Sequence, residues 1–453
     1  MIKYFSKHKY LVAFILIIAL FIPYSIYQVP ETDKISVITS IGLDKIDKGI
    51  QLSVNTIIPN SGTMSGGGGS DGTVKYMVVN GKNVGDAFTR LALVLGKLPG
   101  LAHCDSIVIN KKLFEKDVTE YLDYFVRTNN LTSNASLIVA EKSAKEIIET
   151  AASQKGLRAI TLSDVLLLNH EYVLAKKSNI DAFYANYFSN SSSMALPILS
   201  VGQSNEGEED LGDNEDKQSG TGDQNNSQSN DSGSSQDSGS DSSDSQSSGQ
   251  GDGESSKNGG QSGSSGSTPP TKILKNEGKG LVVKKGKAIK IIEGEDMEGL
   301  SLLSKTIKKG HIQVDNVNSD EFNDATLNFD IFKKKVTTNG YFLGDTPVFN
   351  YDILLILRLE EVVMDSYDIT SMVAVKNFVK GNIKDVTQET IHSTLAHIIN
   401  TCKNNQTDIL GVYDYFFKYH TQQWKDFLDG LDNKEDYLKY VVFTCDLTTQ
   451  GKI

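Results

Sequence analysis

The chain has 453 residues, which is more than a single hydrophobic core organises, so we expect several domains. Its formal net charge of −12 is unevenly distributed: 14 of the 57 acidic and 2 of the 45 basic residues lie between Gln203 and Thr268, leaving 43 of each sign elsewhere. No other segment has the concentrated Lys and Arg excess by which proteins displace counterions from phosphates. We therefore expect no nucleic-acid partner.

The three cysteines, Cys104, Cys402 and Cys445, are odd in number, far apart and without a C-x-x-C spacing. This pattern predicts neither a disulfide framework nor a zinc site. We favour their being small buried hydrophobic residues; one disulfide between two of them, outside the cytosol, is the alternative.

The N-terminal sequence indicates on which side of a membrane the protein lies. Residues 1–9 carry three lysines, residues 10–30 contain no charged side chain, and Leu11–Ile22 is continuously apolar. Positive charge before an apolar segment retains the N-terminus inside, which predicts a basic cytoplasmic end (1–9) and a single-pass transmembrane helix (10–30) with the bulk of the chain outside. A cleaved signal segment is the alternative, but residues 23–29 lack the usual small-x-small cleavage site.

Residues 31–200 are predicted to form an N-terminal α+β domain, because strands and helices interleave without strict alternation. An antiparallel pair of strands is expected around a turn at Gly42–Asp44, and Ser143 with Glu146 has the form of a capping box that opens a helix. The predicted strands are 35–41, 50–58, 74–79, 107–109 and 136–140, and the predicted helices include 84–95 and one around 118–125.

Residues 203–268 consist almost entirely of Ser, Gly, Asp, Gln, Asn and Glu. Such a segment buries too little apolar surface to offset its ordering entropy, which predicts a disordered acidic insert. It acts either as a tether between the flanking domains or as a tolerated insertion without a role, and we favour the latter.

Order is expected to return in a small middle β domain (272–310) and a C-terminal α+β domain (311–453). The middle domain should contain a hairpin turning at Lys285–Lys287 and a short helix or turn at 297–304. The C-terminal domain should contain strands at 311–317, 325–336 and 348–360, helical segments at 387–402, 408–419 and 424–428, and a closing strand at 440–447. The overall prediction is a multidomain α+β ectodomain of mixed and antiparallel sheets with packed helices, preceded by one transmembrane helix.

No catalytic, cofactor-binding or metal site is predicted. The chain lacks a P-loop, a dinucleotide fingerprint, H-E-x-x-H and G-x-S-x-G. His392 and His397 are five residues apart on one predicted helix, where metal ligands prefer three or four, and His103 precedes a strand; we interpret all three as structural. Glu360 and Glu361 are expected on a solvated edge. Lys333–Lys335 could contact an anionic surface, but we favour an edge strand that is protected from aggregation by charge.

Three stretches, in this order, resemble the Ger(x)C family of spore germination proteins. The first is Ser40-Ile-Gly-Leu-Asp44 with the strand that ends at Ile58-Pro59. The second runs from Leu95-Gly-Lys-Leu through His103, Ile107–Ile109 and Tyr121–Arg127 to Ala144-Lys-Glu-Ile-Ile148. The third comprises Gly280–Ala288, Asp408-Ile-Leu-Gly411, Trp424 and Thr449-Gln-Gly451.

The resemblance implies a non-enzymatic, membrane-anchored subunit of a germinant receptor, needed for nutrient-triggered germination and located on the outer face of the inner spore membrane. It also implies two integral membrane subunits as partners and no small-molecule cofactor. Family members usually carry a lipid-modified Cys after a signal peptide, whereas no Cys precedes Cys104 here. The helix at 10–30 is therefore expected to be the anchor.

Two other functions remain open for an anchored extracytoplasmic protein. A hydrolase acting on cell-wall material would need two convergent carboxylates about 5 to 9.5 Å apart in an open cleft. A sensor of soluble ligands would instead show a deep apolar pocket with a few polar groups.

Overall fold

The computed structural model describes residues 34–58, 73–128, 131–153, 162, 178–204, 271–276, 278–366 and 368–452. Described residues on either side of Gln203–Thr271 belong to one compact unit. The predicted cytoplasmic end (1–9) and transmembrane helix (10–30) lie outside the described residues, and so does the predicted acidic insert (203–268) apart from Gln203 and Ser204, which end a strand. Within the described ranges, no helix is both long and apolar enough to span a membrane.

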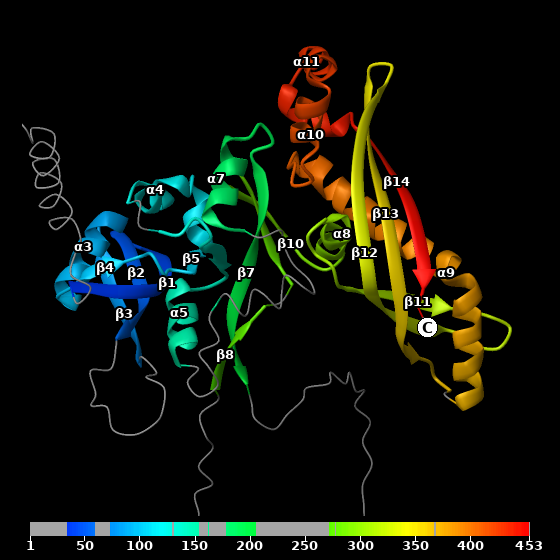
Figure 1. Ribbon diagram of the computed structural model, residues 1–453, viewed down its shortest axis with the longest axis horizontal. Coiled ribbons are helices and arrows are strands. Elements are labelled where there is room, and N and C mark those ends of the chain that lie inside the picture. Colours follow the sequence, from blue (N-terminus) through cyan, green and yellow to red (C-terminus); the bar gives the residue numbers. More distant parts are fainter. Residues whose placement is uncertain are drawn as a thin grey trace, which may run out of the picture. The chain divides into compact units, whose positions relative to one another are not determined.

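The first sheet is mixed and contains ten strands of the described chain, in the order β10-β9-β7-β6-β5-β1-β2-β3, with β4 paired to β1 and β8 to β7 (Figure 1). Its central neighbours β1, β5, β6 and β7 are parallel, and its two ends are antiparallel. The strands are β1 (Ile35–Ile46), β2 (Gly49–Ile58), β3 (Thr73–Gly81), β4 (Leu98–Gly100), β5 (Ser106–Asn110), β6 (Ser136–Ala140), β7 (Ser193–Ser204), β8 (Thr271–Lys275), β9 (Gly280–Lys284) and β10 (Lys287–Ile292).

Of the helices beside this sheet, α3, α4 and α5 lie where the sequence predicted helices, whereas α7 and the 3-10 helix were not predicted. In α3, the buried residues recur at helical spacing, from Val84 to Leu91, and its N-cap Asn83 accepts a hydrogen bond from the Asp86 amide. The helices are α3 (Val84–Leu95), a 3-10 helix (Lys111–Glu115), α4 (Thr119–Arg127), α5 (Ala144–Ser153) and α7 (Ile180–Phe188).

The predicted antiparallel pair β1–β2 is confirmed, but the predicted turn at Gly42–Asp44 is wrong. β1 continues through these residues to Ile46, and the chain reverses after it, at Asp47 and Lys48. The reason is tertiary: Leu43 is fully buried, and Asp44 binds the start of a helix 100 residues later. Glycine and aspartate favour turns, but here the tertiary contacts override that local preference.

The second sheet has the order β11-β12-β13-β14, with β14 parallel to β13 and the other pairs antiparallel. Its strands are β11 (His311–Val317), β12 (Ala325–Leu343), β13 (Thr346–Val363) and β14 (Val442–Gly451). The helices of this part are α8 (Glu295–Leu303), α9 (Ile369–Asn405), α10 (Val412–Tyr419) and α11 (Thr421–Asp429), followed by a 3-10 helix (Lys434–Lys439).

Helix α9 is longer than the predicted helix at 387–402. It begins at Ile369, where the Asp368 side chain accepts a hydrogen bond from the Ser371 amide at 2.6 Å, and it is interrupted at Asn382. Buried aliphatic residues continue along one face of its first half, including Val375 and Val379, and they join the core under the second sheet.

The α+β class with mixed and antiparallel sheets is thus confirmed. The predicted hairpin at Lys285–Lys287 is confirmed as β9–β10, with Lys285 and Gly286 both at positive φ. β9 is hydrogen-bonded to β7, so the strands assigned to the middle domain (272–310) extend the first sheet. The division into separately folding domains stays a prediction.

Candidate functional site

A cavity of about 570 Å³ is lined by β7, α8 with the segment after it, β12, β13 and α10 with the segment before it. Its walls are largely apolar; they include Met194, Leu300, Leu303, Ile409 and Leu410. Pockets for small molecules typically measure roughly 300 to 1,000 Å³ and combine apolar walls with a few polar groups. The cavity has this size and character.

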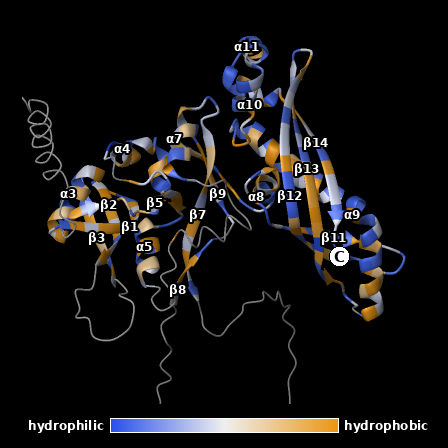
Figure 2. Cartoon of the chain, viewed as in Figure 1, coloured by the Kyte–Doolittle hydropathy of each residue, from blue (hydrophilic) through white to orange (hydrophobic). Residues whose placement is uncertain are grey.

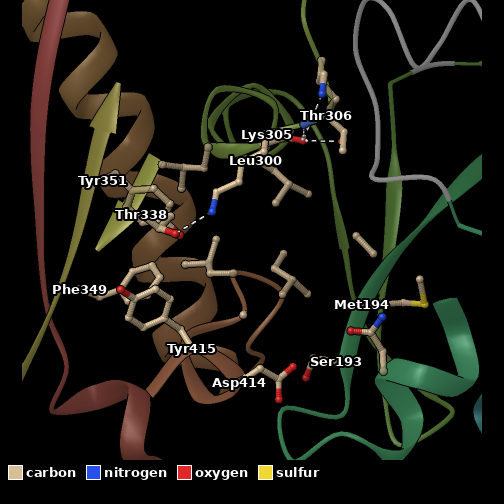
Figure 3. Close-up of a pocket in the computed structure, with 18 of the residues that line it drawn as sticks. Ser193, Met194, Leu300, Lys305, Thr306, Thr338, Phe349, Tyr351, Asp414 and Tyr415 are labelled. Carbon is tan, nitrogen blue, oxygen red and sulfur yellow. Dashed lines mark hydrogen bonds between the residues drawn. The ribbon is translucent and has the colours of Figure 1, made fainter. Parts of the chain in front are cut away.

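Three charged side chains line this cavity: Lys305, which follows α8, and Asp414 and Lys418 of α10. Figure 3 labels Lys305 and Asp414. The Lys305 ammonium donates a hydrogen bond to Thr338 Oγ1 at 2.7 Å, and Asp414 lies near Ser193 on the other side of the drawn residues. Asp414 Oδ2 accepts a hydrogen bond from Ser191 Oγ at 3.4 Å. The cavity thus offers two cationic groups and one anionic group together with apolar surface.

The apolar wall at Ile409 and Leu410 is held by Asp408. This carboxylate is 2 % exposed and accepts hydrogen bonds from the Val412 amide (3.0 Å), the Tyr413 amide (2.7 Å) and the Tyr437 hydroxyl (2.7 Å). It therefore caps the start of α10, where a carboxylate also suits the helix dipole. Gly411, just before the helix, has φ +76°, a conformation that favours glycine.

Trp424 fixes α11 against α10. Its side chain is fully buried and stacked between Phe416 (centroid distance 4.9 Å) and Phe427 (5.1 Å). Trp424 thereby packs on α10, the helix that follows the Asp408–Gly411 motif, and residues 409–411 of that motif line the cavity.

A second carboxylate with several partners is Asp44 on β1. It accepts hydrogen bonds from the backbone amides of Ala144 (2.9 Å) and Lys145 (2.7 Å) and from Asn110 Nδ2 (2.6 Å). The predicted N-cap Ser143 contributes through its Oγ, which accepts from the Glu146 amide at 3.3 Å. The first and second sequence motifs thus meet at the N-terminus of α5, where the carboxylate serves the fold.

Lys334 is the residue whose environment in the structure differs most from the predicted one. Lys333 and Lys335 are exposed as predicted, but Lys334 is 6 % exposed and donates a hydrogen bond to the Ser301 carbonyl. Burial, and secondarily the nearby Lys308 charge, lower the pKa of Lys334 to about 7. A register shift between Ile331 and Lys333 changes the in-out alternation and turns Lys334 inward.

His397 lies on α9 against Asp296 of α8, with 3.0 Å between Nδ1 and Oδ1. The Asp296 side chain is 6 % exposed and also accepts from Lys290 Nζ of β10 at 3.0 Å. This arrangement gives His397 a structural partner, in line with its interpretation. Within the described ranges, no group of three or more His, Cys, Asp or Glu side chains could hold a metal ion.

The other predicted candidates lie apart from the cavity lining. His103 is exposed, His392 is half-buried on α9, and Glu360 accepts a hydrogen bond from Arg358 at 2.9 Å. The three cysteines form no disulfide with one another, and burial raises the pKa of the Cys104 thiol to about 12 and that of Cys445 to about 11. Such thiols are poor nucleophiles and poor metal ligands at neutral pH.

Sequence reasoning missed the cavity, because its walls come from segments more than 200 residues apart. The motif Asp408–Gly411 was the available signal, since Ile409, Leu410 and Gly411 all line the cavity.

Comparisons with known proteins agree with the sequence motifs. The family model "Spore germination protein N-terminal domain" matches residues 28–201, and "Spore germination B3/ GerAC like, C-terminal" matches residues 277–447. The chain belongs to the GerAC-like family of spore germination proteins. The resemblance to the Ger(x)C family is therefore confirmed, and the two matched ranges flank the acidic insert.

A curated relative in this family is spore germination protein KC of Bacillus subtilis (strain 168), which is 25 % identical over 145 residues. The alignment covers 31 % of this chain and 36 % of the relative, so it spans about a third of that protein. The crystal structure of the GerBC protein is similar with a TM-score of 0.45 and 12 % identity, covering 91 % of this chain and 97 % of that one.

Proposed function

We propose that this protein is a non-catalytic, membrane-anchored, extracytoplasmic subunit of a spore germinant receptor, needed for nutrient-triggered germination. The observation that carries the proposal is the match of both GerAC-like domains, in the same order, over residues 28–201 and 277–447. Its partners are two integral membrane subunits, and it lies at the inner spore membrane with its bulk outside the cytoplasm.

The placement of the motifs supports a scaffold role. Asp44 and Asp408 each bind two backbone amides at the start of a helix, and Trp424 is buried among aromatic rings. These side chains stabilise the fold, and none of them faces a cleft in the way that a catalytic group must. They stabilise the folded surfaces through which a binding subunit contacts its partners.

The apolar segment near the N-terminus supports a membrane anchor. The ten Leu, Ile, Phe and Val residues of Leu11–Ile22 contribute roughly −3 to −6 kcal/mol to membrane insertion, and the lysines before them orient the segment. A charged residue at the centre costs about 2.5 to 3.5 kcal/mol. Replacing Ile17 and Leu20 together by Asp should therefore abolish anchoring.

The test uses a deletion strain complemented with the tagged full-length chain. Membranes from sporulating cells are solubilised in mild detergent, the chain is purified, and spores are tested for germination after nutrient addition. We expect two polytopic membrane subunits to co-purify with the wild-type chain, and the deletion strain to lose its response to at least one nutrient.

The control is the conservative pair Ile17→Val and Leu20→Val, which should retain the partners and the response, whereas the double Asp variant should lose both. Intact germination in the deletion strain, together with a wild-type chain that recovers neither partner, would refute the proposal.

A second candidate function, binding of a small soluble ligand, is favoured by the cavity of about 570 Å³. The cell-wall hydrolase is not favoured by this cavity, because Asp414 is the one carboxylate in its lining and a glycosidase needs two. Thr338→Trp would fill the cavity next to Lys305, while Thr337→Trp adds the same ring at an exposed neighbouring position. A ligand-binding role predicts that Thr338→Trp spores respond to nutrient poorly and Thr337→Trp spores normally; equal responses would contradict it.

A further inference from the structure

Three exposed hydrophobic side chains lie at the end of α3 and the start of β4. Leu93 is 79 %, Val94 62 % and Leu98 60 % exposed. α3 and β4 contact each other, so these residues form one surface, hereafter the α3–β4 patch. Figure 1 shows the two elements next to each other, and hydrophobic residues are visible in this region in Figure 2.

The patch has no role in the core of the domain. Side chains on a helix advance by about 100° per residue, so Leu93 points about 200° away from the fully buried Leu91. The same solvent-facing side carries Asp86 and Arg90, which form an ion pair at 3.0 Å. A leucine at this position costs solubility without contributing to packing, and clustered exposed apolar residues typically mark an interaction surface.

The position of the patch relative to the start of the described chain indicates what covers it. β4 pairs with the first residues of β1, with Ile35 opposite Leu98. A Cβ added to Gly100 of β4 would lie 2.5 Å from Ile35 Cγ2, so the two strands are in close contact. The start of β1 therefore lies at the patch.

The proposed transmembrane segment ends at Pro30, five residues before Ile35. A chain spans at most about 3.6 Å per residue, so these five residues reach no further than about 18 Å. Patch residues adjoining Ile35 are thereby held near the membrane surface, whose interfacial layer is about 5 to 8 Å deep on each side.

Two of the charged side chains around the patch suit a membrane surface. Lys34, which precedes β1, and Lys97, which precedes β4, are both exposed. Lysines that flank an apolar surface are attracted to anionic lipid headgroups while the apolar side chains enter the interface.

We propose that the α3–β4 patch docks on the outer surface of the membrane and inserts Leu93, Val94 and Leu98 into the lipid interface. This inference rests on the membrane anchor of the proposed function. It assigns the first domain a fixed orientation, with α3 and β4 toward the bilayer.

The test places an environment-sensitive fluorophore on single cysteines of the full-length chain, in a background carrying Cys445→Ser because Cys104 and Cys402 are buried. The labelled positions are Leu93→Cys and Leu98→Cys. The matched control is Leu343→Cys, a leucine with 73 % exposure that is the last residue of β12. Each protein is reconstituted into vesicles of phosphatidylcholine and phosphatidylglycerol. Membrane association is measured by flotation of the vesicles. In a second measurement, the fluorescence is quenched by lipids that carry a spin label at the headgroup or in the upper acyl chain.

We expect the labels at 93 and 98 to show blue-shifted emission and at least twofold stronger quenching than the label at 343. A chain that floats with the vesicles but whose labels at 93 and 98 are quenched no more than the label at 343 would refute the docking surface alone, including when a second copy or a protein partner covers the patch. A chain that does not float would refute the anchor, and the docking surface with it.

Discussion

Lys334 is the residue whose environment departs furthest from what its chemistry favours. Its side chain is buried, and the Ser301 carbonyl of α8 accepts a hydrogen bond from its ammonium group. A lysine in such a place destabilises the fold while it is charged, because burial penalises the charged form.

Replacing Lys334 by Met should stabilise the protein by about 1 to 3 kcal/mol at pH 6, after allowing for the lost hydrogen bond. The pKa is lowered to about 7 in the folded state, so below pH 7 the charged form is present in both states and the burial penalty is complete. Between pH 7 and about 10.5 the unfolded state binds more protons, so the stability of the wild type rises and the advantage of the variant shrinks.

Urea unfolding of both proteins at pH 6, 8 and 10 measures this difference, with Lys333→Met, an exposed neighbour, as the control. A pH-independent difference between Lys334→Met and the wild type would contradict the assignment of a neutral buried lysine.

Asp44 shows how one carboxylate can stabilise three elements. Asp44→Ala removes the acceptor of the Ala144 and Lys145 amides and of Asn110 Nδ2, and we expect a loss of about 2 to 3 kcal/mol. Asp47→Ala, in the exposed turn three residues later, should cost less than about 0.5 kcal/mol. Denaturant unfolding midpoints compare the two, and similar losses would show that Asp44 does not cap α5.

At the scale of elements, the packing of α5 on β1 requires a glycine. A Cβ on Gly42 would lie 2.4 Å from Ser53 Oγ, 2.8 Å from Ile148 Cγ1 and 3.2 Å from the backbone carbon of Ala144. Helix α5 can approach the sheet closely because position 42 has no side chain.

Gly42→Ala should therefore destabilise the protein by about 1 to 3 kcal/mol through overpacking. Gly85→Ala in α3 should instead stabilise the protein. Its added Cβ would lie 3.5 Å from the nearest atom, and alanine is a better helix former than glycine. The gain should be about 0.5 to 1 kcal/mol. Thermal midpoints measured by circular dichroism should fall for the first variant and rise for the second; a rise for both would mean that α5 has room to shift.

At the scale of the whole molecule, charged contacts connect the hairpin of the first sheet with the segment before β14. Glu435 accepts hydrogen bonds from Lys285 Nζ (2.9 Å) and Lys284 Nζ (3.3 Å), and Lys284 Nζ also donates to the Gln406 carbonyl at 2.9 Å. The hydrogen bond from Lys285 and the Lys284 charge lower the pKa of Glu435.

Glu435→Gln should cost about 0.5 kcal/mol at pH 7, a small value because the carboxylate is half-exposed. A lowered folded-state pKa means that this contribution is present above the ordinary glutamate value of 4.5 and is lost as pH falls through the folded pKa. Unfolding at pH 7 and pH 3, with Asp432→Asn as an exposed control, tests the pH dependence. A difference that persists at pH 3 would exclude the charge as its cause.

Local sequence determined most of the elements of this protein. Periodicity located α3 at its observed bounds, alternation located β11 to β13, and the Lys285–Lys287 turn located the β9–β10 hairpin, because these signals depend on neighbouring residues alone. The motifs also indicated the family, although their roles were hidden: Asp44 and Asp408 bind helices that local patterns could not associate with them.

Tertiary structure decided the rest. The turn predicted at Gly42–Asp44 became strand because α5 packs on it, Lys334 turned inward because a bulge changed the alternation, and the candidate cavity formed from segments around residues 194, 300 and 410. Each outcome depends on contacts between residues far apart in the chain, and the free energy of burying those surfaces overrides local preference.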